Sequence, residues 1–112
     1  MQIHSRNDAW VLGREPPEGW PTDGDFRWVT RDQQLPDRGQ ALTKTVYLSM
    51  DPYQWGRRRS GTEVPGDVCH GRTVSEVIAS RSDVYREGDI IFNTNGWQRF
   101  GLVGNGIDIF GY

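Results

Sequence analysis

An alternating strand pattern over residues 40–50 stops abruptly at Asp51-Pro52, and this change constrains the fold more than any other feature of the chain. Valine, tyrosine and leucine in this segment favour an extended strand with two distinct faces. Proline lacks a backbone N–H group and fixes its own φ angle, so it ends the ladder of hydrogen bonds. We therefore expect Tyr53 and Arg57 just beyond the strand, in a helical turn or loop, where scaffolds commonly present functional groups.

Glycine and proline divide the rest of the chain into short segments. The 112 residues include 14 glycines and 6 prolines, which indicate frequent turns. No segment has the length and periodicity of an ordinary helix. The length suits one domain, and five Trp, four Tyr and four Phe supply apolar area for its core. These features predict a mostly β fold, either a small barrel or a partly open sandwich.

Alternation with a period of two and clusters of turn residues predict where the strands lie. Residues 1–6 are expected to form a loose tail, and residues 61–72 a long connection that contains three glycines. The expected strands are residues 7–13, 25–31, 40–50, 73–80, 90–93 and 97–103.

Two finer expectations concern strand faces and strand pairing. The pair Asn95-Gly96 is a strong hairpin signal between the last two strands, although residues 93–96 also fit a longer loop. Along the strand 40–50, alternation predicts one apolar face, which would carry Leu42, Val46, Leu48 and Met50.

The charge balance and the single cysteine exclude several classes of protein. A formal net charge of −2 gives no general attraction to nucleic acid or to anionic membranes. Cys69 has no second cysteine to pair with, which fits a reducing compartment, and no apolar run approaches the ~20 residues of a membrane span. We expect a cytoplasmic protein without nucleic-acid or membrane partners.

Three segments resemble the zinc-independent medium-chain dehydrogenase/reductases, the family of NADP-dependent 2-alkenal and prostaglandin reductase-like enzymes. Residues 45–53 and Gly56-Arg57 resemble the family signature VYLSLDPYMRGRM, and residues 71–81 resemble GGGVGRVVESR. Residues 88–98 resemble GDWVLGYSGWQ. The resemblance implies a GroES-like β-barrel domain over residues 7–103, whereas residues 104–112 depart from the family.

This resemblance implies a function in hydride transfer. In a complete enzyme of the family, NADPH reduces the C=C bond of a small α,β-unsaturated carbonyl, and the N-terminal domain forms one wall of the substrate cleft. Tyr53, and with it Arg57, would contact substrate there. The alternative for Tyr53 is a structural aromatic residue packed under its loop. The catalytic residues themselves are not identified.

No residues for holding the cofactor are expected in this chain. The glycine-rich stretch of residues 101–106 has the spacing G-x-x-G-x-G, whereas a dinucleotide fingerprint has G-x-G-x-x-G. We interpret it as a turn, predict no Rossmann domain, and expect the chain alone to bind no cofactor and to be inactive. NADP is implied only for a complete enzyme.

Two further segments carry side chains that could bind a metal ion or nucleic acid, Cys69-His70 and the arginine run 57–59. Cys69 and His70 are adjacent, and neighbouring side chains seldom ligate one metal ion tetrahedrally, so no metal site is expected. Cys69 is interpreted as a small buried filler. Arg57-Arg58-Arg59 beside Trp55 fits single-stranded nucleic acid, but a solvated turn with its arginines paired to carboxylates is preferred.

A second function, from another class, also fits the sequence. An isolated barrel of this family would expose an apolar patch, and such patches tend to be covered by another subunit. The chain would then be a small binding or assembly module that forms a homodimer. Residues 104–112 are apolar enough to cover such a patch.

Overall fold

The structure is a computed structural model that describes residues 6–14 and 19–105. Within these residues the fold is mostly β, as expected. A short 3₁₀ turn, η1 (Asp23–Asp25), and one helix, α1 (Tyr53–Arg59), accompany the strands. The strands are β1 (Arg6–Leu12), β2 (Phe26–Asp32), β3 (Ala41–Leu48), β4 (Thr73–Ser80), β5 (Ile90–Asn93) and β6 (Phe100–Val103).

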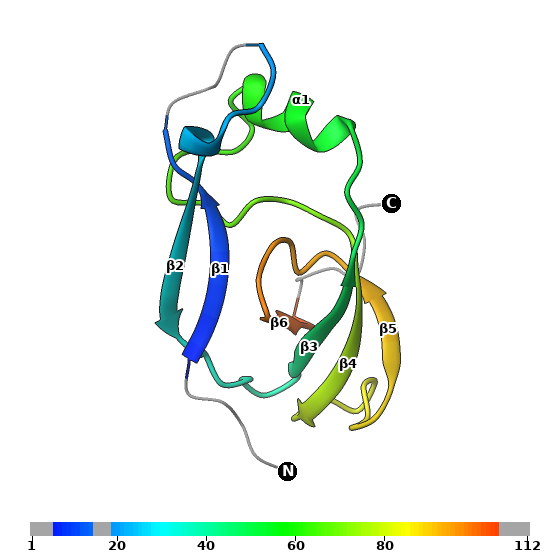
Figure 1. Cartoon of the computed structure of the whole chain (residues 1–112). Helices are drawn as coiled ribbons and strands as arrows, with labels where there is room; N and C mark the ends of the chain where they lie inside the picture. The colour runs from blue at the N-terminus through cyan, green and yellow to red at the C-terminus, as the bar shows by residue number, and fades with distance from the viewer. Residues whose placement is uncertain (1–5, 15–18, 106–112) are drawn as a thin grey trace.

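The described strands form two antiparallel sheets. β1 and β2 form a long two-stranded ribbon, and the other sheet has the order β5-β4-β3-β6 (Figure 1). Isolated bridges join Ala9 to Gln98 and Val11 to Val68, so the ribbon is linked to segments that flank the larger sheet. Strand ladders are confined to these two sheets among the described residues, and closure into a complete barrel stays a prediction.

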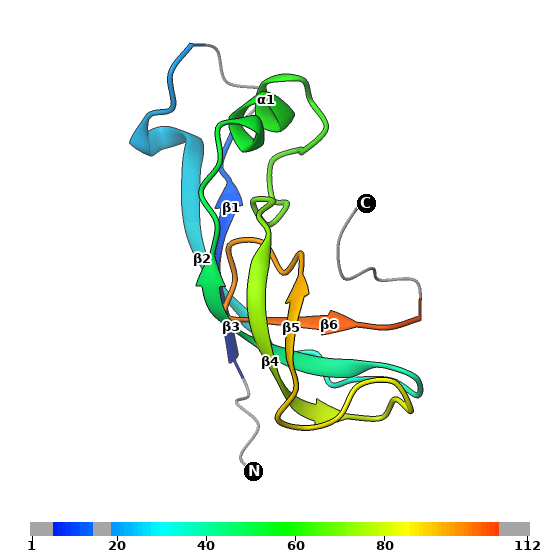
Figure 2. The same ribbon diagram turned by 90° about the vertical axis from the view of Figure 1, so that its right-hand side faces the viewer.

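The predicted hairpin at Asn95-Gly96 is wrong, and the longer loop is confirmed. β5 pairs with β4 whereas β6 pairs with β3, so the two strands lie at opposite edges of the sheet (Figure 1), although they overlap in the turned view of Figure 2. The loop between them bonds to other segments instead: Gly96 N–H donates to Gly71 O, and Trp97 N–H to Cys69 O. Gly96 and Trp97 make these contacts, and Arg99 N–H donates to Asp8 O, so β6 begins only at Phe100.

The strand boundaries otherwise follow the sequence pattern closely. β4 and β5 begin and end at the predicted residues. β3 ends at Leu48, before the predicted limit. β1 begins at Arg6, inside the segment expected to be a tail, and the rest of that tail lies outside the described residues.

The predicted apolar face of β3 holds only in part. Leu42 is fully buried, but Val46 is 48 % exposed and Met50 is 65 % exposed. The register of β3 against β4 shifts twice, between Leu42 and Thr43 and between Thr45 and Tyr47. Each shift interrupts the regular alternation of faces, so a strict period of two does not describe this strand.

Two small apolar clusters hold the larger sheet together. They lie on either face of the beginning of β3, where neighbouring residues Ala41 and Leu42 point to opposite sides. The first cluster contains Ala41, Val77 and Val103 with Tyr85 and Ile91 packed against it, and the second contains Leu42, Ile78 and Phe100 with Ala79 and Leu102.

The rest of the sheet interior is polar and neutral. Asn95 donates to the hydroxyl groups of Thr43, Thr45 and Ser75 at 2.9, 3.0 and 3.1 Å. Asn93 donates to Asn95 Oδ1 at 2.8 Å. We call this set the amide network, and its buried members are Thr43, Thr73, Ser75, Asn93 and Asn95.

The outer face of the same sheet carries an exposed apolar row. Tyr47 lies opposite Val74, and Val74 lies opposite Phe92, so the three side chains share one face. Tyr47 is 71 % exposed and Phe92 is 68 % exposed. No helix among the described residues is long and apolar enough to cross a membrane.

Candidate functional site

The predicted helical turn after the strand 40–50 is confirmed as α1, which lies at one end of the molecule beside the loop that joins β1 to β2 (Figure 1). Pro52 has φ −58°, the value that proline fixes and a helix requires. Gln54 is buried, and its amide donates to Ser49 O at 2.7 Å. This bond ties α1 to the end of β3 and so fixes where Tyr53 emerges.

Tyr53 meets His70 at the surface of this end. The Tyr53 hydroxyl lies 2.9 Å from His70 Nε2, and the two rings contact edge to face with centroids 5.6 Å apart. Tyr53 is 38 % exposed, so it is neither sealed in the interior nor fully solvated. Backbone bonds from Cys69 to Trp10 and from Trp97 to Cys69 hold the segment that carries His70.

Two arginines flank the Tyr53–His70 pair. Arg57 is four residues after Tyr53 and therefore lies on the same face of α1. The guanidinium carbon of Arg72 lies 5.3 Å from the centre of the Tyr53 ring, within cation–π range. Among the described residues, Nε of Arg57 is buried and has no hydrogen-bond acceptor. The structure thus places His70 and Arg72 beside Tyr53, in addition to the predicted Arg57.

The interpretation of Arg57-Arg58-Arg59 as a solvated turn is wrong for Arg58. This residue is only 2 % exposed, and its Nε lies 3.0 Å from Oε2 of buried Glu63, as an ion pair outside ideal hydrogen-bond geometry. Its guanidinium packs over the Trp97 ring at 4.7 Å. Arg58 is therefore part of the scaffold, paired to a carboxylate as expected but buried.

The surroundings of His70 favour the neutral imidazole. Partial burial is the main cause that lowers the pKa of His70, and the guanidinium charges of Arg57, Arg58 and Arg72 lower it further. A neutral ring can either accept a hydrogen bond from the Tyr53 hydroxyl or donate one to its oxygen, according to the tautomer. In the second case the phenol O–H group remains available to a carbonyl oxygen.

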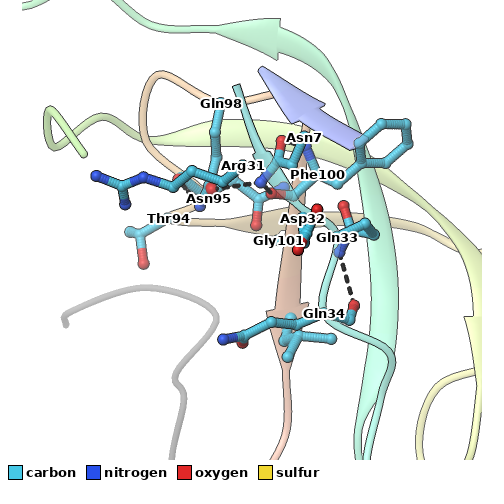
Figure 3. Close-up of a pocket in the computed structure, with 11 residues that line it drawn as sticks. Asn7, Arg31, Asp32, Gln33, Gln34, Thr94, Asn95, Gln98, Phe100 and Gly101 are labelled. Atoms are coloured by element: carbon cyan, nitrogen blue, oxygen red, sulfur yellow. Dashed lines mark hydrogen bonds between the residues drawn. The ribbon is translucent and has the colours of Figure 1, made fainter. Parts of the chain in front are cut away.

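A polar cavity of about 310 Å³ lies between the end of β2 and the loop before β6 (Figure 3). Neither Tyr53 nor Arg57 lines it. Figure 3 shows its amide side chains arranged around the start of β6, among them Asn7, Gln34 and Gln98. A smaller cavity of about 190 Å³ is lined by Trp10, Trp28 and Trp97, again without the predicted site residues.

Sequence patterns gave no reason to select His70, Arg58 or Arg72. Arg58 stands where the signature VYLSLDPYMRGRM has methionine, and Arg72 where GGGVGRVVESR has its second glycine. These two departures from the family signatures are the sequence features that could have drawn attention to Arg58 and Arg72. Cys69 is fully buried, as expected of a small filler. The described residues contain no group of three or more His, Cys, Asp or Glu placed to hold a metal ion.

Comparison with known proteins identifies the relatives of this chain. NADPH-dependent curcumin reductase of Escherichia coli is 38 % identical over 106 residues, which are 90 % of this chain and 30 % of that protein. Mouse prostaglandin reductase 1 is 31 % identical over 100 residues, which are 88 % of this chain and 30 % of the relative. The chain spans less than a third of the length of these relatives.

Solved structures agree with the sequence matches. CurA from Vibrio vulnificus superimposes with a TM-score of 0.82 at 32 % identity, over 87 % of this chain and 30 % of that one. CurA from Vibrio vulnificus in complex with NADPH gives a TM-score of 0.77 at 30 % identity, over 90 % of this chain and 34 % of that one. The family described as N-terminal domain of oxidoreductase matches residues 8–109. The chain therefore belongs to this family of oxidoreductase N-terminal domains, and the resemblance to medium-chain dehydrogenase/reductases is confirmed.

Proposed function

We propose that this chain forms the substrate-side wall of an NADP-dependent reductase that adds hydride to the C=C bond of an α,β-unsaturated carbonyl. The observation that carries the proposal is the half-exposed Tyr53, held at the end of the sheet by His70 at 2.9 Å. Relatives of the chain include an NADPH-dependent curcumin reductase and a 2-alkenal reductase.

The proposed roles follow from the chemistry of the side chains. Hydride addition at the β-carbon leaves negative charge on the carbonyl oxygen, and a donor aimed at that oxygen stabilises the charge. Tyr53 supplies such a donor when His70 donates to its oxygen. Arg57, on the same face of α1, adds a positive charge at the rim. The α-carbon then takes a proton to complete the reduction.

The described residues do not fit a nucleotide-binding site. A pyrophosphate is held by a glycine-rich turn at a helix N-terminus. Gly101 instead lies in β6 opposite Thr43, where an added Cβ would come 2.1 Å from Asn95 Oδ1. Gly104 adopts φ +98° close to the backbone of Gly39. Both glycines therefore serve packing and turn geometry. We assign no contact with NADPH to the described residues of this chain.

It follows from the proposal that the 112 residues alone bind no NADPH and lack reductase activity. Mixing the chain with NADPH and an enone tests this, with NADPH absorbance as the readout. We expect no oxidation of NADPH above the uncatalysed rate and no saturable change in tryptophan fluorescence. Saturable NADPH binding at micromolar concentration contradicts this part of the proposal.

A chimaeric enzyme tests the site itself. The chain replaces the corresponding third of the E. coli curcumin reductase, to which it is 38 % identical. We expect the chimaera to reduce an enone and Tyr53→Phe to lower its kcat/KM by about 10- to 100-fold, the range expected for losing one donor to a developing oxyanion. Tyr47→Phe is the matched control, because Tyr47 is an exposed tyrosine on the outer face of β3. Equal activity of both variants contradicts the role of Tyr53.

The compartment proposed for the enzyme is the cytoplasm. Cys69 is a free cysteine, and it is buried. A chain without a disulfide needs no oxidising compartment for its folding.

The exposed apolar row supports a second candidate function, a self-associating module. Tyr47, Val74 and Phe92 lie side by side on the outer face, and β5 is at the edge of the sheet that the described residues form. We propose that a second copy of the chain covers this row. The segment 104–112, named above as apolar enough to cover a patch, lies outside the described residues from 106 onward.

Sedimentation at increasing concentration tests the homodimer. Phe92→Lys places a charge in the row and is expected to give a monomer. Val84→Lys is the control, because Val84 is 77 % exposed but lies outside the row. A wild-type chain that remains monomeric at high concentration, or a dimer that survives Phe92→Lys, contradicts this candidate.

A further inference from the structure

Two charged side chains hold the backbone of His70. Its N–H group donates to Oε1 of Glu63 at 2.6 Å, and its carbonyl oxygen accepts from Nη2 of Arg58 at 3.2 Å. The residues on either side, Cys69 and Gly71, bond instead to backbone groups of other segments. Arg58 and Glu63 thus bracket a single residue of this segment.

The same two side chains also contact each other. Nε of Arg58 lies 3.0 Å from Oε2 of Glu63, and the side-chain exposures are 3 % and 5 %. The Arg58 guanidinium packs over the rings of Trp97 and Phe26, at 4.7 and 5.7 Å from their centres. Hydrogen bonds made by charged groups are stronger than those between neutral groups, so this pair holds its target firmly. We call Arg58 and Glu63 the His70 clamp.

Stability of the fold does not by itself account for the His70 clamp. Taking two charges out of water is costly, and an apolar pair of similar volume is often at least as stable. Arg58 stands where the family signature VYLSLDPYMRGRM has methionine, an apolar residue. The reason for a charged pair here is therefore sought in the residue that it holds.

The ring that the His70 clamp holds is the one that contacts Tyr53. Nε2 of His70 lies 2.9 Å from the Tyr53 hydroxyl, and the rings meet edge to face with centroids 5.6 Å apart. A phenol carries one hydrogen for donation. It can therefore donate to a substrate carbonyl only when His70 donates to its oxygen, which requires the proton of the neutral imidazole on Nε2.

We propose that the His70 clamp serves the reaction: it fixes His70 so that Nε2–H donates to the Tyr53 oxygen and the phenol O–H group is left for the substrate. The inference rests on the proposed function, because it takes Tyr53 as the substrate contact. His70, Arg58 and Glu63 are positioning residues in this scheme, since they act through Tyr53.

The chimaeric enzyme tests the clamp by its effect on kcat. Arg58→Met/Glu63→Gln removes the clamp without leaving an unpaired buried charge. We expect kcat for an enone to fall by about 10-fold and KM to change by less than about 2-fold, because a misplaced donor is lost mainly to the transition state. Asp8→Asn/Arg99→Gln is the matched control, since it removes an exposed ion pair with the same 3.0 Å separation. An unchanged kcat without the clamp, or an equal loss in the control, overturns the inference.

Variants of His70 separate positioning from a general effect on folding. His70→Gln keeps an N–H donor on its side chain, whereas His70→Leu removes it. We expect His70→Gln to retain most of the kcat and His70→Leu to lower it by about 10-fold. Removing the His70 clamp from the His70→Leu chimaera should cost no further activity, because the ring through which it acts is already absent. A full second loss, or equal kcat in the two His70 variants, contradicts the proposal.

NMR of the 112-residue chain gives a readout that does not depend on activity. The chain contains two histidines, so His70→Gln identifies the His70 ring signals, whose nitrogen shifts show which nitrogen carries the proton. We expect the proton on Nε2 in the neutral ring. Loss of the His70 clamp should speed hydrogen exchange of the His70 amide by about 10-fold or more. A proton on Nδ1, or unchanged exchange, overturns the inference.

The proposed function is decided separately by Tyr53→Phe in the chimaeric enzyme. A chimaera that depends on Tyr53 but not on the His70 clamp leaves the function intact and removes the clamp's role. An inactive chimaera, together with both expected NMR results, refutes the reductase function and keeps the clamp as the device that orients the tyrosine–histidine pair.

Discussion

The buried polar groups beside α1 include a charged pair, whereas those between β3, β4 and β5 are all neutral. At the first place, Arg58 and Glu63 form an ion pair with side-chain exposures of 3 % and 5 %. At the second, Asn93 and Asn95 bond to each other and to threonine and serine hydroxyl groups. Both regions lie inside one small domain, so we compare what the charged pair and the neutral network each contribute to it.

The amide network uses its donors internally. Both amide donors of Asn95 find hydroxyl oxygens, and its Oδ1 accepts from Asn93. A network satisfied in this way fixes the fold but has little left to offer a ligand. The charged end differs, because the half-exposed Tyr53 remains within reach of solvent or ligand and Nε of Arg57 has no acceptor among the described residues. We infer that the first region contributes to stability and the second to recognition.

The largest expected effect comes from breaking the buried ion pair. Arg58→Met restores the residue of the family signature but leaves the Glu63 carboxylate buried without its partner. We expect the free energy of unfolding, measured in urea, to fall by about 3–5 kcal/mol. The double variant Arg58→Met/Glu63→Gln should recover most of this loss, because it removes the uncompensated charge.

An exposed ion pair with the same geometry provides the control. Arg99 Nε lies 3.0 Å from Asp8 Oδ2, the separation found between Arg58 and Glu63, but the two side chains are 65 % and 28 % exposed. Arg99→Gln should therefore change the free energy of unfolding by only about 0–1 kcal/mol. Comparable losses in Arg58→Met and Arg99→Gln would refute the view that the α1 end depends on buried charge.

A smaller loss is expected from crowding the amide network. In Gly101→Ala the new Cβ would lie 2.1 Å from Asn95 Oδ1, and the hydrogen bonds of Asn95 oppose its movement. Overpacking of this kind costs about 1–3 kcal/mol. Gly56→Ala is the control, since a Cβ there meets nothing within 4 Å and alanine favours α1 by up to about 1 kcal/mol.

The cause of that loss can be checked in a second background. If the clash with Asn95 is responsible, Gly101→Ala should cost much less in a chain that already carries Asn95→Ala. A loss of the same size in both backgrounds would mean that the glycine is required for another reason, such as backbone flexibility in β6.

Local patterns in the sequence were enough to predict most strands. The predicted bounds of β4 and β5 are confirmed because turn residues flank both segments: Gly71 precedes β4, the turn 82–87 and Gly88 separate the two strands, and Asn95-Gly96 follows β5. The helical turn after Asp51-Pro52 follows equally from the chemistry of proline. The substrate role of Tyr53 and Arg57 stays a prediction.

Long-range contacts could not be predicted in this way. The partner of β6 depends on backbone bonds from the loop before it to residues 69–71, and no local pattern encodes such bonds. A run of three arginines is typical of a solvated surface. The burial of Arg58 depends on Glu63, which follows in the next loop, and on Trp97, which is distant in the chain and reaches Arg58 only in the fold.

The smallest expected effect on stability, and the most specific for the charged end, is its pH dependence. The pKa of His70 lies below the 6.5 that is usual for histidine, mainly because of burial and then because of Arg57, Arg58 and Arg72. The unfolded chain therefore binds a proton at higher pH than the folded chain does. Stability should fall as the pH drops through 6.5 and level off below the pKa of the folded state.

Titration of the His70 ring resonances by NMR measures this pKa directly. Arg57→Gln and Arg72→Gln should each raise it, because each removes a positive charge that opposes protonation. Asn95→Ala should leave it unchanged, since the amide network contains no titratable group. A His70 pKa at or above 6.5 in the folded chain, or one that responds equally to Asn95→Ala, would show that the two regions are not electrostatically distinct.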